Sequence, residues 1–187
     1  MNNQTKTKKL VTCAVMVALA TVLSLIKVYK LPLGGSITLL SMLPICMLSL
    51  KYGLKWGLAS SFVYSTFQLF LGLKDLMSWG LTAKMWVGSI IFDYLLAFTL
   101  IGLAGIFRNK GLPGIVSGIS LALILRFASH FVSGCIFFGI WSEWDNIYLY
   151  SIAYNGSFML PELIFTVAGA IALFKVPQTR KLLLSDD

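Results

Sequence analysis

Long apolar runs, separated by short polar or basic turns, dominate this chain from one end to the other. A transmembrane helix needs about 20 mainly apolar residues, and these runs do not alternate residue by residue as the strands of a membrane barrel do. The pattern predicts an all-α integral membrane protein with a single domain, residues 1–187. Its six expected transmembrane helices cover approximately residues 10–26, 37–50, 56–73, 87–107, 114–141 and 147–174.

Composition supports the same fold class. Hydrophobic residues make up 58% of the chain and charged residues 12%, and the mean hydropathy is +0.85, which is far from the composition of a soluble domain. The apolar run 10–25 follows three lysines, but no small-residue cleavage site comes before Lys27, so we interpret this run as the first span. The length leaves no room for a soluble catalytic domain, and we expect no enzyme.

The basic residues predict the orientation in the bilayer. The N-terminal segment, the second and fourth turns and the C-terminal segment together hold ten Lys and Arg, whereas the other loops hold four. By the positive-inside rule both termini are expected in the cytoplasm of a multi-pass cell-membrane protein, with loops 1, 3 and 5 outside. The net charge of +8 is scattered singly along the chain. We therefore expect the lipid bilayer as a partner and no nucleic acid.

The stretch 126–161 carries the strongest functional signal. Arg126 and the only histidine, His130, stand four apart in an apolar run and so lie on one helical face. Ionisable residues inside a span indicate a functional site. Tyr150 and Asn155 follow one hairpin later and can hydrogen-bond a polar solute. Alternatively, His130 is a packing histidine and Asn155 a helix-to-helix hydrogen bond.

Asp93 lies within the apolar run GSIIFDYLLAF. A carboxylate at the bilayer centre costs about 2.5–3.5 kcal/mol on insertion scales, so it must face protein or water. An ion pair with Arg126 would explain it structurally. Functionally, an acid beside aromatic faces suits a small cationic ring compound, and these residues lie toward the expected outer side.

Other residue types bring no further chemistry. The three cysteines lie in apolar runs without metal-ligand spacing, so we expect buried thiols, no metal site and no cofactor. Trp79 and Trp144 are typical of the aromatic belt at the membrane interface. The chain has no HExxH motif for a zinc hydrolase and no P-loop, so it cannot energise transport with ATP by itself.

Four ordered blocks resemble the thiamine-specific substrate-binding components of energy-coupling factor (ECF) transporters. They are LPLGGSITLLSMLPI (31–45), FDYLLAFTLIGLAGIFR (92–108), RFASHFVSGCIFFG (126–139) and YLYSIAYNGSFMLPE (148–162). The resemblance implies six helices, high-affinity capture of thiamine outside the cell, and docking onto a transmembrane coupling subunit driven by two ATP-binding subunits.

The resemblance also assigns roles by position. It implies that thiamine contacts Asp93, His130, Phe138, Tyr150 and Asn155, with Trp141 and Gly35 completing the set of substrate-binding residues. Some members of the family have Trp in place of Phe138 or Gly35.

Ala14 and Ala18 match the family's docking motif in the first helix. They stand in a small-xxx-small spacing that permits close helix approach. The spacing by itself is more typical of packing against the protein's own helices.

The residues are also compatible with a second function. A secondary transporter would couple thiamine or another small cationic ring compound to protons through Asp93, His130 or Glu162. Such proteins are usually built from inverted repeats and broken helices, and we identify no internal repeat in this sequence.

Overall fold

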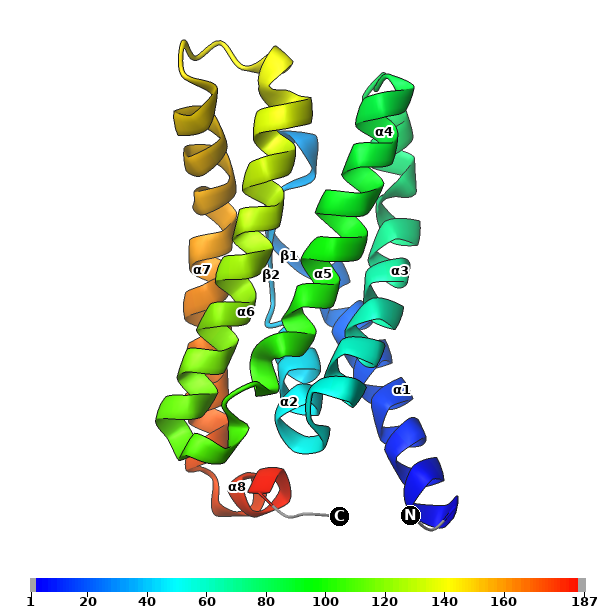
Figure 1. The fold of residues 1–187 in the computed structure, drawn as a ribbon, viewed down its shortest axis with the longest axis vertical. Coiled ribbons are helices and arrows are strands. Elements are labelled where there is room, and N and C mark those ends of the chain that lie inside the picture. The colour runs from blue at the N-terminus through cyan, green and yellow to red at the C-terminus, as the bar shows by residue number, and fades with distance from the viewer. Residues whose placement is uncertain (1–2, 185–187) are drawn as a thin grey trace.

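The computed structural model describes residues 3–184 and shows a bundle of long helical rods (Figure 1). Four rods are continuous α-helices: α1 (Asn3–Leu25), α3 (Leu54–Ser78), α6 (Gly111–Ser133) and α7 (Ile147–Lys175). Another rod joins α4 (Ala83–Ser89), a π-helical stretch (Ile90–Leu96), α5 (Ala97–Thr99) and a 3-10 stretch (Leu100–Gly105). Two short helices, α2 (Leu43–Tyr52) and α8 (Pro177–Leu184), lie toward the end of the bundle where α1 begins.

Length and composition mark four of the described helical segments as able to cross a membrane. They are Gln4–Leu25, Ala83–Gly105, Arg108–Phe138 and Ile147–Lys175. α3 has 25 residues, enough for a span, but it is more polar than these four. The chain is therefore a mostly helical protein that passes through the membrane several times, in agreement with the predicted class.

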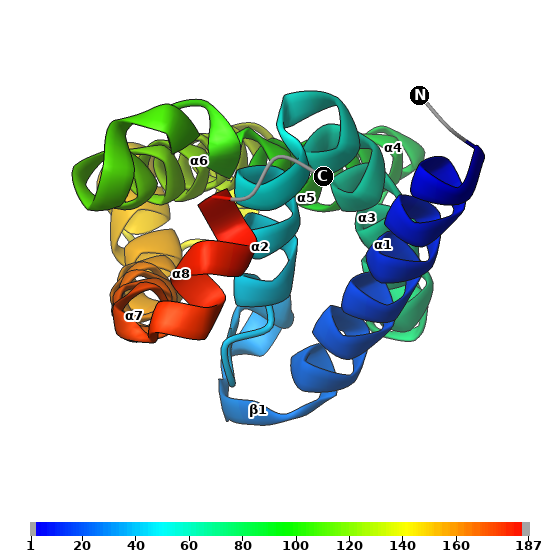
Figure 2. The same cartoon turned by 90° about the horizontal axis from the view of Figure 1, so that it is seen from below.

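α2 forms the centre of the half of the bundle that also holds α8 and the start of α1 (Figure 1). Its residues from Leu43 to Leu50 are all buried, as expected for a helix that is apolar all round. Viewed from the α8 end, α2 lies between α6 and α7 on one side and α1 and α3 on the other (Figure 2). Ser49 of α2 donates a hydrogen bond of 2.5 Å to the carbonyl oxygen of Gly102 and accepts one of 2.9 Å from the N–H of Gly105.

A β-hairpin before α2 corrects two sequence-based expectations. The segment 27–36, predicted as a loop, begins with β1 (Lys27–Lys30), which pairs antiparallel with β2 (Ser36–Thr38). The helix expected from residue 37 consequently begins only at Leu43. Between them the backbone turns through Leu40, whose φ of 57° is unusual for a residue with a side chain.

The third connection is shorter than expected. The segment 74–86 is predicted as an outer loop with room for some helix, and in the structure α3 continues to Ser78 and α4 begins at Ala83. The hydroxyl of Thr82 accepts a hydrogen bond from the N–H of Met85 and so caps the start of α4. The π-helical stretches that follow, Ile90–Leu96 here and Gly134–Phe138 after α6, flank the region where the candidate site lies.

Candidate functional site

A cavity of about 210 Å³ opens between the hairpin, α3, the α4–α5 rod, α6 and α7. This volume far exceeds the roughly 10–15 Å³ that one water molecule requires. Six of the seven residues predicted to bind substrate line the cavity. They are Gly35, Asp93, His130, Phe138, Tyr150 and Asn155.

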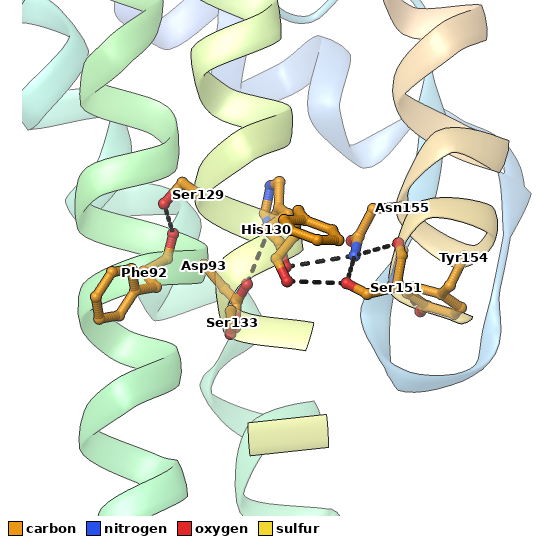
Figure 3. A network of polar contacts seen from close by, with 10 residues as sticks. Phe92, Asp93, Ser129, His130, Ser133, Ser151, Tyr154 and Asn155 are labelled. Carbon is orange, nitrogen blue, oxygen red and sulfur yellow. Dashed lines mark hydrogen bonds and ion pairs between the residues drawn. The ribbon is translucent and has the colours of Figure 1, made fainter. Parts of the chain in front are cut away.

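Asp93 and His130 form the polar centre of the site. His130 Nδ1 lies 3.0 Å from Asp93 Oδ1, and the hydroxyl of Ser133 donates to Asp93 Oδ2 over 2.5 Å (Figure 3). The side chain that contacts Asp93 is thus His130 rather than Arg126, the partner weighed from the sequence. Asp93 lies in the π-helical stretch of its rod, a distortion that is frequent at functional sites because it changes the direction of side chains.

Asn155 connects α7 to this centre. Its Nδ2 donates to the carbonyl oxygen of His130 (3.3 Å) and to both the carbonyl oxygen (3.0 Å) and the hydroxyl (3.2 Å) of Ser151 (Figure 3). Asn155 therefore makes the helix-to-helix hydrogen bond that was the structural interpretation. The amide nitrogen is occupied by these acceptors, so the group that Asn155 offers to the cavity is its carbonyl oxygen.

Aromatic rings form the walls around the polar centre. Tyr150 stacks on Tyr154 with ring centroids 5.9 Å apart, and Phe158 meets the His130 ring edge-on at 5.8 Å. On the opposite wall Phe138 contacts Trp79 edge-on at 6.1 Å. These faces give a delocalised cation favourable surroundings.

The hairpin closes one side of the cavity at its turn. Tyr154 donates to the carbonyl oxygen of Pro32 and accepts from the N–H of Gly35 at 3.1 Å. A Cβ at Gly35 would lie 2.8 Å from the Phe158 ring, closer than side chains tolerate. Glycine at this position lets the hairpin lie directly against α7, and a tryptophan, as some family members have, would require a different packing.

A second polar cluster lies in the same cavity. Glu162 is 1% exposed and Arg126 6% exposed, and the two are close enough to interact electrostatically. Glu162 Oε1 accepts from both the N–H (2.5 Å) and the hydroxyl (2.7 Å) of Thr38. Arg126 donates to the sulfur of Met42 over 2.6 Å, and its guanidinium lies 4.2 Å from the Phe98 ring centroid.

Two of the tryptophans differ from their expected placement. Trp141, the seventh predicted substrate contact, is absent from the cavity lining; it is 39% exposed and packs behind Phe138 with ring centroids 5.5 Å apart. Trp79, interpreted as a belt residue, instead lines the cavity beside Gly34. Trp144 is exposed, as an interfacial residue should be, and contacts Tyr150 edge-on.

Sequence reasoning missed Tyr154, Phe158 and the clamp between Thr38 and Glu162. The signal for the α7 residues was present, because Tyr154, Phe158 and Glu162 follow Tyr150 at intervals of four and so share its helical face. The partnership of Thr38 with Glu162 had no such signal, since 124 residues separate them.

An exposed ion pair ties the hairpin to α3 at the rim. Lys30 Nζ lies 2.8 Å from Asp75 Oδ2, with both side chains about half exposed. The hydrogen bond from Lys30 lowers the pKa of the Asp75 carboxyl, which lies beyond the predicted span 56–73. Exposed pairs of this kind contribute little to stability.

The predicted docking residues lie on the outer face of the bundle. Ala14 and Ala18 of α1 are both exposed, while Cys13, Val17 and Ala20 are buried against the protein. In the described structure the two alanines therefore do not pack in the interior, which was the structural alternative for their spacing.

The fold and cavity define a polytopic membrane protein with a solute-sized, acid- and aromatic-lined pocket within its helices. Comparison with known proteins identifies the family of this membrane protein. The model of the family "Thiamine transporter protein (Thia_YuaJ)" matches residues 10–182, and the chain belongs to this family. This confirms the resemblance drawn from the four sequence blocks.

Individual relatives agree. The thiamine transporter ThiT of Bacillus subtilis is 29% identical over 189 residues, covering 93% of this chain and 94% of its own. ThiT of Lacticaseibacillus paracasei is 25% identical over 150 residues, covering 72% and 71%. The solved structure of ThiT from Listeria monocytogenes shares the fold, with a TM-score of 0.75 at 22% identity over 97% of this chain and 100% of that one.

Proposed function

We propose that this chain captures thiamine from outside the cell and serves as the substrate-specificity component of an ECF transporter. The observation that carries the proposal is the pairing of Asp93 with His130 inside an aromatic-walled cavity. Thiamine combines a cationic thiazolium ring with an aminopyrimidine ring, and the cavity offers a carboxylate, aromatic faces and hydrogen-bonding groups to match. Membership of the thiamine transporter family supports the same substrate.

Each lining residue then has a defined role. Asp93 balances the cation or accepts from the amino group, and His130 fixes the position of the carboxylate. Phe138 and Tyr150 present ring faces to the two rings of thiamine, and the carbonyl oxygen of Asn155 accepts from the ligand. Gly35 lets the turn of the hairpin lie close to the aromatic side chains of α7. Trp141 acts from behind, by supporting Phe138.

The proposed topology has six spans in one membrane domain with both termini in the cytoplasm. The charge distribution supports it, because the two terminal segments and the second and fourth turns together carry ten of the Lys and Arg residues. The start of α1 and helix α8 also lie at the same end of the bundle (Figure 1). The cavity, with Asp93 and the hairpin, would then lie toward the external side.

We further propose that a transmembrane coupling subunit docks on the face of α1 that carries Ala14 and Ala18. Their exposure supports this, because small side chains at a lipid-facing position let another helix approach closely. Two ATP-binding subunits would supply the energy. The chain is proposed to work as a transporter component rather than as an enzyme. The alternative of a proton-coupled secondary transporter is not favoured by the family to which the chain belongs.

Titration of the purified protein, without any partner, tests this function. Thiamine should quench tryptophan fluorescence, because Trp79 and Trp141 lie at or next to the cavity, and riboflavin should not. Absence of thiamine binding, or equal binding of riboflavin, would refute the proposal.

A further inference from the structure

Glu162 is a buried acid that the proposed contacts with thiamine do not use. It lies seven residues after Asn155, two turns along the same face of α7, as Arg126 lies one turn from His130 on α6. The second polar cluster therefore lies directly next to the Asp93–His130 centre, deeper in the same cavity. An ionisable side chain inside a membrane span is energetically costly, so its presence indicates a structural or functional role.

The two oxygens of Glu162 have different surroundings. Oε1 accepts two hydrogen bonds, 2.5 Å from the N–H and 2.7 Å from the hydroxyl of Thr38. Oε2 has no hydrogen-bond partner among the residues described, and neither has Arg126 Nε. Glu162 thus uses one oxygen to hold the last residue of β2 through two hydrogen bonds, and Arg126 lies close enough to interact with it electrostatically.

Thr38 lies between the paired strands of the hairpin and the strained turn that leads into α2. It pairs with Lys27 across the hairpin, and its hydroxyl also contacts Ser41 at 2.7 Å. Two residues later Leu40 adopts a left-handed backbone conformation, with φ of 57°. Such a residue costs about 1–3 kcal/mol and persists only where its surroundings over-determine it. The clamp from Glu162 provides that constraint on the strand immediately before the strained turn.

We propose that Glu162 is a positioning residue that fixes β2, and through it the turn at Gly35, over the thiamine site. The hairpin contacts α7 at two heights, through Tyr154 at its turn and through Glu162 at its base. The base contact consists of two short hydrogen bonds to one buried carboxyl oxygen, so it should be the stronger. Without it the hairpin opens more often and bound ligand leaves faster.

Amide hydrogen exchange on the purified, unliganded protein tests the clamp without relying on thiamine binding. Glu162→Gln keeps the shape but weakens the acceptor and presents amide hydrogens to Arg126. Peptides covering residues 27–40 should then exchange about tenfold faster, the size of losing one buried hydrogen bond, while peptides of α3 remain unchanged. Thr38→Ser retains both donors and should behave as the parent.

Thr166→Val is the matched control. Thr166 lies one turn beyond Glu162 on α7, is buried, and its hydroxyl has no hydrogen-bond partner in the described chain. Unchanged hairpin exchange in Glu162→Gln would overturn the proposal, as would equal acceleration in all helices. If Glu162→Gln does not fold, Thr38→Val, which removes only the hydroxyl donor, decides in the same way.

The consequence for the ligand rests on the proposed function and is measured separately. The rate of thiamine dissociation should rise at least about tenfold in Glu162→Gln, with the association rate within about threefold of the parent. Faster hairpin exchange with an unchanged dissociation rate would overturn the link between hairpin and ligand. If the parent protein does not bind thiamine, the proposed function fails while the exchange result still decides the clamp.

Discussion

α1 and the pair α6–α7 both differ from a plain apolar span, but they differ in the type of unusual residue and in the side of the helix that carries it. On α1 the unusual residues are small, and Ala14 and Ala18 are exposed on the outside of the bundle. On α6 and α7 the unusual residues are polar, and His130, Asn155 and Glu162 are all buried. The bundle thus separates an outer surface suited to helix docking from an inner surface suited to a solute.

The separation has a simple physical basis. Polar groups in a bilayer must face protein or water, because lipid offers them no partners. Small residues carry no such penalty and can face lipid, where they leave room for another helix. Substitutions on the two surfaces should therefore affect different measurements.

The largest effect is expected on the outer surface. Ala14→Trp or Ala18→Trp should abolish co-purification with the coupling subunit and thiamine uptake by cells, because close helix approach tolerates almost no added volume. Thiamine binding by the isolated protein should be nearly unchanged. Leu19→Trp is the control, since Leu19 is also exposed on α1 but is turned about 100° from Ala18. Binding lost in step with assembly would contradict the docking role.

The next effect concerns the polar centre of the cavity. Asp93→Asn should keep the fold but weaken thiamine binding by about 1–3 kcal/mol, the scale of a charge-assisted hydrogen bond. The substitution keeps a side-chain oxygen within reach of His130 and removes only the negative charge. Isothermal titration with thiamine measures the change, and thermal unfolding of the unliganded protein checks the fold. A normally folded variant that binds like the parent would mean that the acid is structural.

A smaller effect should come from the hairpin turn. Tyr154→Phe removes the hydroxyl that contacts Pro32 and Gly35, and a neutral hydrogen bond contributes about 0.5–1.5 kcal/mol. Thiamine affinity should fall about two- to tenfold. Tyr148→Phe, on the exposed side of α7, should leave the affinity unchanged. Equal behaviour of the two variants would show that Tyr154 does not hold the turn.

The smallest effect is expected at the exposed rim. Because Lys30 lowers the pKa of Asp75 in the folded protein, the pair stabilises the hairpin above the ordinary pKa of the carboxyl, about 3.8. That contribution is lost as the pH falls through the lowered pKa. At neutral pH Asp75→Asn should change hairpin exchange less than about fivefold, since exposed pairs contribute about 0–1 kcal/mol. A larger change would place the main hairpin contact at the rim instead of at Glu162.

Much of this architecture follows from the one-dimensional pattern. The apolar runs predicted a helical multi-pass membrane protein, and the four blocks predicted its family, which the family match confirms. The hairpin escaped prediction because β1 and β2 have only four and three residues, too few for a periodic signal. The same shortness hid the late start of α2.

The composition of the cavity was partly predictable and its connections were not. Asp93, His130 and Asn155 stood out because polar residues are costly in a span. That Asp93 pairs with His130 and not with Arg126 depends on the π-helical turn that aims its side chain.

The sequence by itself determined the fold class, the family and six of the residues that line the cavity, because hydropathy and local spacing act over a few turns of one helix. Only the tertiary structure decided that Trp141 lies behind the wall, that Trp79 lies within it, and that Glu162 holds Thr38. These contacts join elements far apart in the chain. They arise from how the rods pack around α2, and no local pattern specifies that packing.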